Sequence, residues 1–101
     1  MGGLSIFIML AKIFLFSNTK GEINNFLEKF FSKKIELEQS LYWQKDFSNP
    51  IELSEFIAAF IDNIEDFNIF MWISLDKDIF IKVSPQNADT LIKYLFERYP
   101  Y

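Results

Sequence analysis

The amino-acid sequence predicts an α+β fold, a small sheet of about four strands with three helices packed on it. Three stretches carry apolar residues at helical spacing, and they alternate with shorter stretches rich in β-branched and aromatic residues. Half of the residues are apolar and 19% are aromatic, which supplies the apolar surface that a core requires. The predicted order is β-α-β-α-β-β-α, and a length of 101 residues predicts a single domain, 1–101.

The chain begins with an apolar run, Leu4 to Phe16, that has Lys12 inside it. The run is too short for a membrane-spanning helix, which needs about 20 apolar residues. It also lacks the early positive charge and the small-residue cleavage site of a secretory signal. We therefore expect a cytoplasmic protein whose natural start is either Met1 or Met9. Within the run, Ile13 to Phe16 predicts a strand that is covered on both faces.

Thr19 and Glu22 have the spacing of a capping box, which predicts a helix capped by Thr19. Apolar residues then recur on one helical face at Ile23, Phe26, Leu27, Phe30 and Phe31.

From Ile35 to Gln44 the apolar period changes to two, which predicts a strand with one packed and one solvated face. The packed face is expected to carry Ile35, Leu37, Leu41 and Trp43.

Asn49 followed by Pro50 predicts the start of a second helix, with Asn49 as its cap. Its apolar stripe is Leu53, Phe56, Ile57, Phe60, Ile61 and Ile64. Two β-rich runs, 69–75 and 79–83, then predict a hairpin. Ser84 and Pro85 predict the start of a third helix with the stripe Ala88, Leu91, Ile92, Leu95 and Phe96, ended by Pro100. The core is expected to include Phe26, Phe30, Phe56, Phe60, Leu91 and Leu95.

The chain has no cysteine and no histidine, and this limits the chemistry it can perform. Disulfides, histidine-based acid–base catalysis and a Ser-His-Asp arrangement are excluded, and zinc sites usually need the same residue types. We expect no enzyme, no cofactor and no metal. The net charge of −4, with a single arginine at Arg98, argues against nucleic acid as a partner, because phosphate contacts need a basic stripe.

Three residue groups have a functional and a structural interpretation. Asp76 and Asp78 have the spacing of a D-x-D metal motif, but a charged hairpin turn explains them better. Lys29, Lys33 and Lys34 are interleaved with phenylalanines, as in some RNA-binding patches, yet those phenylalanines belong to the apolar stripe of the first helix. Tyr42, Trp43 and Phe47 could line a small-ligand pocket or pair across strands in the core.

The distribution of charge is the most informative functional feature. Residues 1–34 carry five lysines against two glutamates, whereas residues 35–89 carry three lysines against eleven acids. A solvated helix face explains part of this imbalance, but such a field would also steer a basic partner protein. The expected partner-binding residues are Glu52, Glu55, Asp62, Glu65, Asp66, Asp76 and Asp78.

With this acidic helix, the charged hairpin and no catalytic set, the chain resembles the small acidic immunity proteins of bacterial polymorphic-toxin and contact-dependent growth-inhibition systems. The resemblance spans the whole length and rests on general character. It implies an inhibitory protein that covers the active site of a cognate basic toxin domain, often a nuclease. A small-ligand or regulatory module and an enzyme that uses carboxylates alone remain the other two functional hypotheses.

Overall fold

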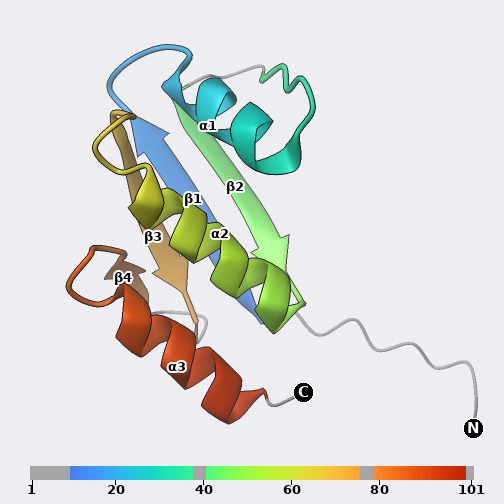
Figure 1. Cartoon of the computed structure of the whole chain (residues 1–101), viewed down its shortest axis with the longest axis vertical. Coiled ribbons are helices and arrows are strands. Elements are labelled where there is room, and N and C mark those ends of the chain that lie inside the picture. The colour runs from blue at the N-terminus through green and yellow to red at the C-terminus, as the bar shows by residue number, and fades with distance from the viewer. Residues whose placement is uncertain (1–9, 38–40, 76–78, 100–101) are drawn as a thin grey trace, which may run out of the picture.

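The structure is a computed structural model that describes residues 10–37, 41–75 and 79–99, and it has an α+β fold in which a four-stranded antiparallel sheet packs against three helices (Figure 1). The elements follow the predicted order β-α-β-α-β-β-α. The strands are β1 (Ala11–Ser17), β2 (Tyr42–Phe47), β3 (Ile69–Ser74) and β4 (Phe80–Lys82). The helices are α1 (Glu22–Phe31), α2 (Pro50–Asp62) and α3 (Ala88–Arg98).

The sheet has the strand order β2-β1-β3-β4, and every neighbouring pair is antiparallel. β1 and β3 are therefore the central strands, and β2 and β4 form the edges. β3 and β4 form the predicted hairpin. At the middle of the sheet, Phe14 pairs with Gln44 on β2 and with Trp72 on β3.

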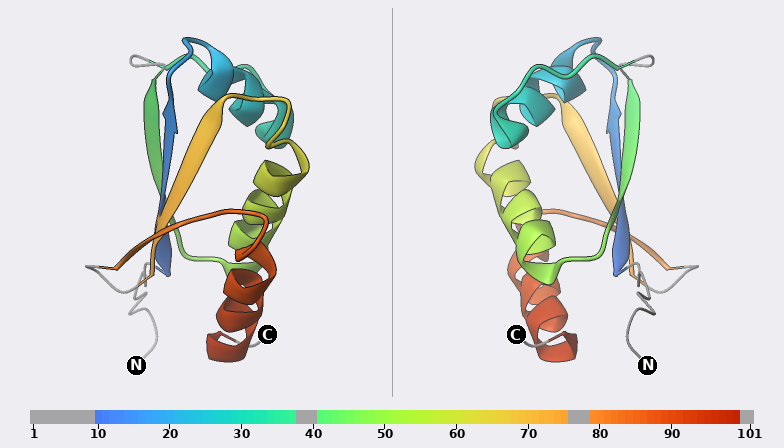
Figure 2. Two further views of the ribbon diagram at one scale, coloured as in Figure 1. Left: turned by 90° about the vertical axis from the view of Figure 1, so that its left-hand side faces the viewer. Right: turned by 90° about the vertical axis from the view of Figure 1, so that its right-hand side faces the viewer.

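All three helices lie on the same face of the sheet (Figure 2). The side chains of β1 alternate accordingly: Ala11, Ile13 and Leu15 are fully buried against the helical layer. The prediction that this strand is covered on both faces is wrong, because Phe16, on the opposite face, is 41% exposed. A run of apolar residues is compatible with one or two covered faces, and here the second face has no helix on it.

The core lies between the sheet and the helices, and the six residues expected in it lie in or against it. Phe96, the last residue of the predicted third stripe, is 39% exposed instead. Phe26, Phe56 and Phe60 are at most 2% exposed, and Leu91 and Leu95 are also buried. Phe30 is partly buried against the same cluster. Its ring lies edge-on to that of Phe56, with the centroids 4.9 Å apart.

The second strand begins at Tyr42, seven residues later than the predicted start at Ile35. Ile35 pairs with side chains of α1 instead of with a strand. Its carbonyl oxygen accepts a hydrogen bond from Asn24 Nδ2 (3.0 Å), and its N–H donates to Glu28 Oε2 (3.4 Å). Ile35 and Leu37 still pack against the core, so their alternation does mark side chains that face it. The backbone at these residues, however, is an irregular segment and not a strand. Leu41 is 44% exposed, not on a packed face.

The predicted capping box at the start of the first helix is absent. Gly21, with φ of 92°, occupies the cap position, and no side chain caps α1. The two polar residues hold a distant loop instead: Asn68 donates from its backbone N–H to Glu22 Oε2 (3.0 Å) and from Nδ2 to Thr19 Oγ1 (2.9 Å). This tertiary contact replaces the local one because Gly21 turns the chain between Thr19 and the helix.

The cap of α2 is confirmed, since Asn49 Oδ1 accepts hydrogen bonds from the N–H groups of Ile51 (2.8 Å) and Glu52 (3.2 Å). α3 begins at Ala88, three residues after the predicted Pro85. Asn87 Oδ1 accepts a hydrogen bond from the backbone N–H of Ser84 (2.9 Å), which holds the intervening residues in a turn. The predicted end at Pro100 lies outside the described residues.

Candidate functional site

The acidic residues predicted to bind a partner gather on the outer side of α2 and on the turn that follows it. Glu52, Glu55 and Asp62 lie in the helix, and Glu65 and Asp66 come after its end. All five side chains are exposed, and together they are called the acidic face below. Asp76 and Asp78, which were expected to extend this surface, lie outside the described residues.

α2 presents three of these carboxylates, Glu52, Glu55 and Asp62, from a firmly anchored helix. Its opposite side inserts Leu53, Phe56, Ile57 and Phe60 into the core, each at most 2% exposed. Because side chains three and four residues apart share a helical face, the outward line contains Glu55 and Asp62. The position of the acidic side chains is thus set by core packing on the other side of the same helix.

Within the parts of the chain that the structure describes, none of the five carboxylates takes part in an ion pair or a side-chain hydrogen bond. The recorded ion pairs join Lys12 with Asp46 (3.6 Å) and Lys34 with Glu36 (3.7 Å), both at other surfaces. One base approaches the end of α2, where Lys29 Nζ donates a hydrogen bond to Asn63 Oδ1 (2.7 Å). The acidic face therefore keeps its charge available for an external partner.

The three aromatic residues that could have formed a ligand pocket point to different sides of the sheet. Trp43 faces the helices, where its ring stacks on Phe56 at 5.6 Å and 29°. Phe47 is in the core and 1% exposed. Tyr42 lies on the opposite face, and its hydroxyl group is hydrogen-bonded to Gln44 Oε1. The three side chains therefore do not share one cavity.

Lys29, Lys33 and Lys34 are exposed around the end of α1, while the neighbouring rings of Phe30 and Phe31 pack on Phe56. Both rings are partly buried against the core. Among the described residues there is also no cluster of acidic groups that could hold a metal ion.

The open face of the sheet carries aromatic side chains, of which only Tyr42 was singled out as a candidate site residue from the sequence. They come from all four strands and are called the aromatic face below: Phe14, Phe16, Tyr42, Phe70, Trp72 and Phe80. The rings contact one another, for example Phe16 and Tyr42 at 5.1 Å and Phe14 and Phe80 at 5.5 Å between centroids. A hollow of about 350 Å³ lies among five of the six rings. In the sequence, Phe14 and Phe16 are two residues apart, and so are Phe70 and Trp72. This spacing places each pair on one face of its strand, but it could be recognised as a signal only once that face was known to be uncovered.

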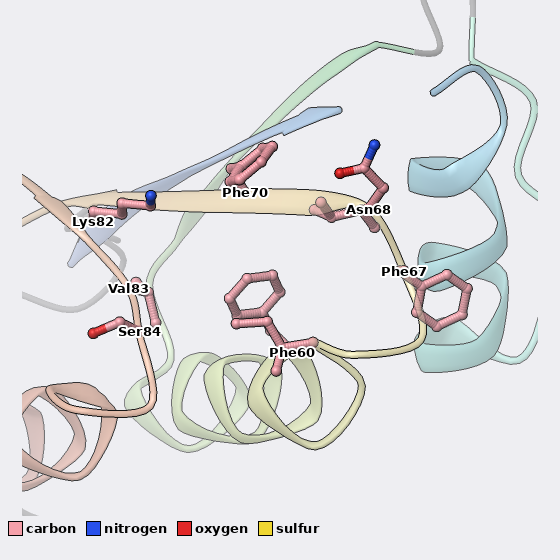
Figure 3. Close-up of a pocket in the computed structure, with 9 residues that line it drawn as sticks. Phe60, Phe67, Asn68, Phe70, Lys82, Val83 and Ser84 are labelled. Atoms are coloured by element: carbon pink, nitrogen blue, oxygen red, sulfur yellow. The ribbon is translucent and has the colours of Figure 1, made fainter. Parts of the chain in front are cut away.

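A second hollow, of about 270 Å³, lies between the end of α2, the start of β3 and the segment after β4 (Figure 3). Phe60 and Val83 form apolar walls and Lys82 lines the hollow with them, whereas the Asn68 amide and the Ser84 hydroxyl group point away from it. Lys82 Nζ also lies 5.2 Å from the centroid of the Phe70 ring. Among the nine residues that line this hollow, Lys82 is the one titratable group, so the site offers a cation but no adjacent base.

Comparisons with protein-family models, with curated proteins and with solved structures found no match to this chain. Functional inference therefore rests on the surfaces described above. None of the helices among the described residues is long and apolar enough to cross a membrane.

Proposed function

We propose that this chain is an inhibitory binding protein of the immunity or antitoxin type, which neutralises a basic toxin domain with nuclease activity through the acidic face. The observation that carries the proposal is the row of exposed carboxylates that has no partner among the described residues and stands on a helix anchored in the core. The resemblance to immunity proteins agrees with it.

The arrangement suits the recognition of a basic surface for two physical reasons. Residues 52–62 place acidic groups along roughly 15 Å of helix, at 1.5 Å per residue, which is long enough to meet several cations of one partner. Carboxylates on a rigid helix are also positioned before binding, so less side-chain and backbone freedom is lost when the complex forms. Charges at the rim of such an interface raise the association rate, and those that become buried against Arg or Lys add specificity.

The proposal is tested by co-expressing the chain with the protein encoded by the gene directly before its own, because an immunity gene follows its toxin gene. We expect the upstream protein alone to arrest growth and co-expression of this chain to restore it. The purified proteins should form a complex. If the upstream protein is harmless and does not bind the chain, the proposal is wrong.

The surface is tested by reversing three charges of the acidic face, Asp62→Lys, Glu65→Lys and Asp66→Lys, in one variant. We expect the dissociation constant to rise at least about 100-fold and protection to be lost, because cations would then meet cations. A matched control with the same change in net charge reverses three exposed acids elsewhere, Glu36→Lys, Asp89→Lys and Glu97→Lys. Equal loss of binding in both variants would show that net charge, not this surface, determines recognition.

The hollow in Figure 3 favours a second candidate function, a small-ligand or regulatory module. A lysine amine beside apolar walls suits a small aromatic or aliphatic carboxylate. Titration with benzoate and hexanoate, followed by NMR shifts of Val83 and Ser84, tests this candidate. Binding that is lost in Lys82→Ala and kept in Lys93→Ala, an exposed lysine on α3, would support it.

A further inference from the structure

The aromatic face departs from what an exposed sheet surface usually carries. Antiparallel sheets with one face in water normally place polar residues on that face. Here the two central strands place Phe14, Phe16, Phe70 and Trp72 there. Phe16, Phe70 and Trp72 are 36–41% exposed, and Phe80 on the edge strand is 53% exposed.

The exposed area is large enough to matter for association. With roughly 200–250 Å² for a whole ring side chain, four rings exposed to this extent present on the order of 350 Å² of apolar surface. Phe14, Tyr42 and the polar side chains at the rim add to it. A stable interface buries about 800 Å² per partner, so the four rings supply a little under half of that area, and the side chains around them have to supply the rest.

We infer that the aromatic face is the interface between two copies of this chain, which pack face to face around a two-fold axis parallel to the strands. This axis places β1 of one copy over β3 of the other, and β2 over β4. Because the pairing register keeps residues at the same level across the sheet, Phe14 meets Trp72 and Phe16 meets Phe70 of the second copy. The apolar centre is thus complementary to itself.

The polar groups at the two edges favour this occupant and this orientation. At the same level as Phe14, the β2 edge carries Gln44 and the β4 edge carries Lys82. The axis along the strands brings Gln44 of one copy over Lys82 of the other. Asp46 lies two residues from Gln44 on the same face of β2. A two-fold axis across the strands at this level would instead place Lys82 against Lys82, where like charges repel.

The same charges disfavour single-stranded nucleic acid as the occupant. Stacking platforms for nucleic acid combine aromatic rings with a basic groove along the backbone path. On this face the lysines are Lys12 and Lys82, and Lys12 already forms an ion pair with Asp46 (3.6 Å). The face is apolar, and Lys12, Lys82 and Asp46 give its rim one net positive charge, which falls short of a basic groove and fits the polar rim of a protein interface. The inference is independent of the acidic face, which lies on the other side of the helical layer.

The oligomeric state of the full chain tests the inference directly. Sedimentation equilibrium and light scattering at 1–200 µM should give twice the chain mass of 12.0 kDa at the upper concentrations. Phe16→Glu should raise the dimer dissociation constant at least 100-fold and return the mass to 12.0 kDa. The matched control is Phe96→Glu, because Phe96 on α3 is 39% exposed, close to the 41% of Phe16, and should leave the dimer intact.

Gln44 provides a second test that keeps all six aromatic residues in place in the sequence and distinguishes the two orientations. Gln44→Glu should strengthen the dimer several-fold by placing a carboxylate over Lys82 of the other copy, and Gln44→Lys should weaken it at least tenfold. Within one chain, Asp46 would repel a glutamate and attract a lysine at position 44. A dimer that is stronger with Gln44→Glu than with Gln44→Lys therefore reports on contact between copies.

A mass of 12.0 kDa at every concentration, or a dimer that survives Phe16→Glu, would overturn the inference. A dimer weakened by Phe16→Glu but indifferent to both Gln44 variants would overturn the orientation. A monomer in which oligo-dT shifts the NMR signals of Phe14 and Trp72 would assign the face to nucleic acid instead.

Discussion

At the scale of single residues, Phe56 has the largest set of aromatic neighbours in the described core. It is fully buried, and its ring lies within 6.3 Å of those of Phe26, Phe30, Phe31, Trp43 and Phe47. These neighbours come from α1 and β2. One side chain of α2 thereby connects the helical layer to the edge of the sheet.

Phe56→Ala is expected to lower the free energy of unfolding by about 3–5 kcal/mol, because it removes a large apolar side chain and leaves a cavity. Urea denaturation followed by circular dichroism measures the loss. The control is Phe96→Ala, an exposed position where we expect a change within about 0.5 kcal/mol. A loss below about 1 kcal/mol for Phe56→Ala would contradict this account of the core.

Asn49 is the second residue whose role can be measured alone. Its side chain accepts hydrogen bonds from two N–H groups that α2 leaves without partners in its first turn. Asn49→Ala should therefore cost about 1 kcal/mol of unfolding free energy. Asn25→Ala, at an exposed position inside α1, is the matched control and should be neutral or slightly stabilising, because alanine favours helix interiors. Equal effects of the two changes would show that Asn49 does not act as a cap.

At the scale of elements, the connection between β1 and α1 is determined by tertiary contacts. Asn68, the residue before β3, donates hydrogen bonds to Thr19 and Glu22, and the hydroxyl group of Ser17 donates to the carbonyl oxygen of Asn68 (2.5 Å). These bonds join segments that lie about fifty residues apart, and they stabilise the pairing of β1 with β3.

If this contact is tertiary, Thr19→Ala and Asn68→Ala should each destabilise the protein, and the double variant should cost less than their sum. A double-mutant cycle in urea should give a coupling energy of about 0.5–1.5 kcal/mol, the usual range for one hydrogen bond. Purely additive losses would show that the hydrogen bond between Thr19 and Asn68 does not contribute to stability.

At the scale of the whole molecule, the helical layer separates two different surfaces (Figure 2). The acidic face lies on the outer side of α2, and the aromatic face lies on the uncovered side of the sheet. A dimer formed through the aromatic face would leave two acidic faces pointing outward, each free to bind one basic partner.

If the acidic face steers the partner, its association rate should fall steeply with ionic strength, because exposed charges are screened beyond about 8 Å at 0.15 M salt. Stopped-flow measurements between 20 and 500 mM NaCl should show the association rate changing much more than the dissociation rate. The dimer proposed for the aromatic face should respond weakly to the same change of salt. If the dimer responded strongly to salt and association of the partner did not, the partner would be assigned to the aromatic face and the dimer to the acidic face.

The sequence by itself determined the order of elements, the helical stripes that form the core and the location of the acidic residues. These features depend on local periodicity and on side chains such as Asn49 that act within a few residues. Leu53, Phe56 and Phe60 could therefore be assigned to the buried side of a helix from their spacing, and Glu55 to its outer side.

The tertiary structure alone decided which strands pair and which sheet face remains open. The run from Ile13 to Phe16 has the same apolar character whether one or two layers cover it, so its exposed side could not be predicted. Ile35 keeps its alternating pattern but pairs with α1 side chains, and Thr19 binds Asn68 rather than its own helix. In each case the sequence pattern was compatible with several partners, and the partner was set by a contact between segments distant along the chain.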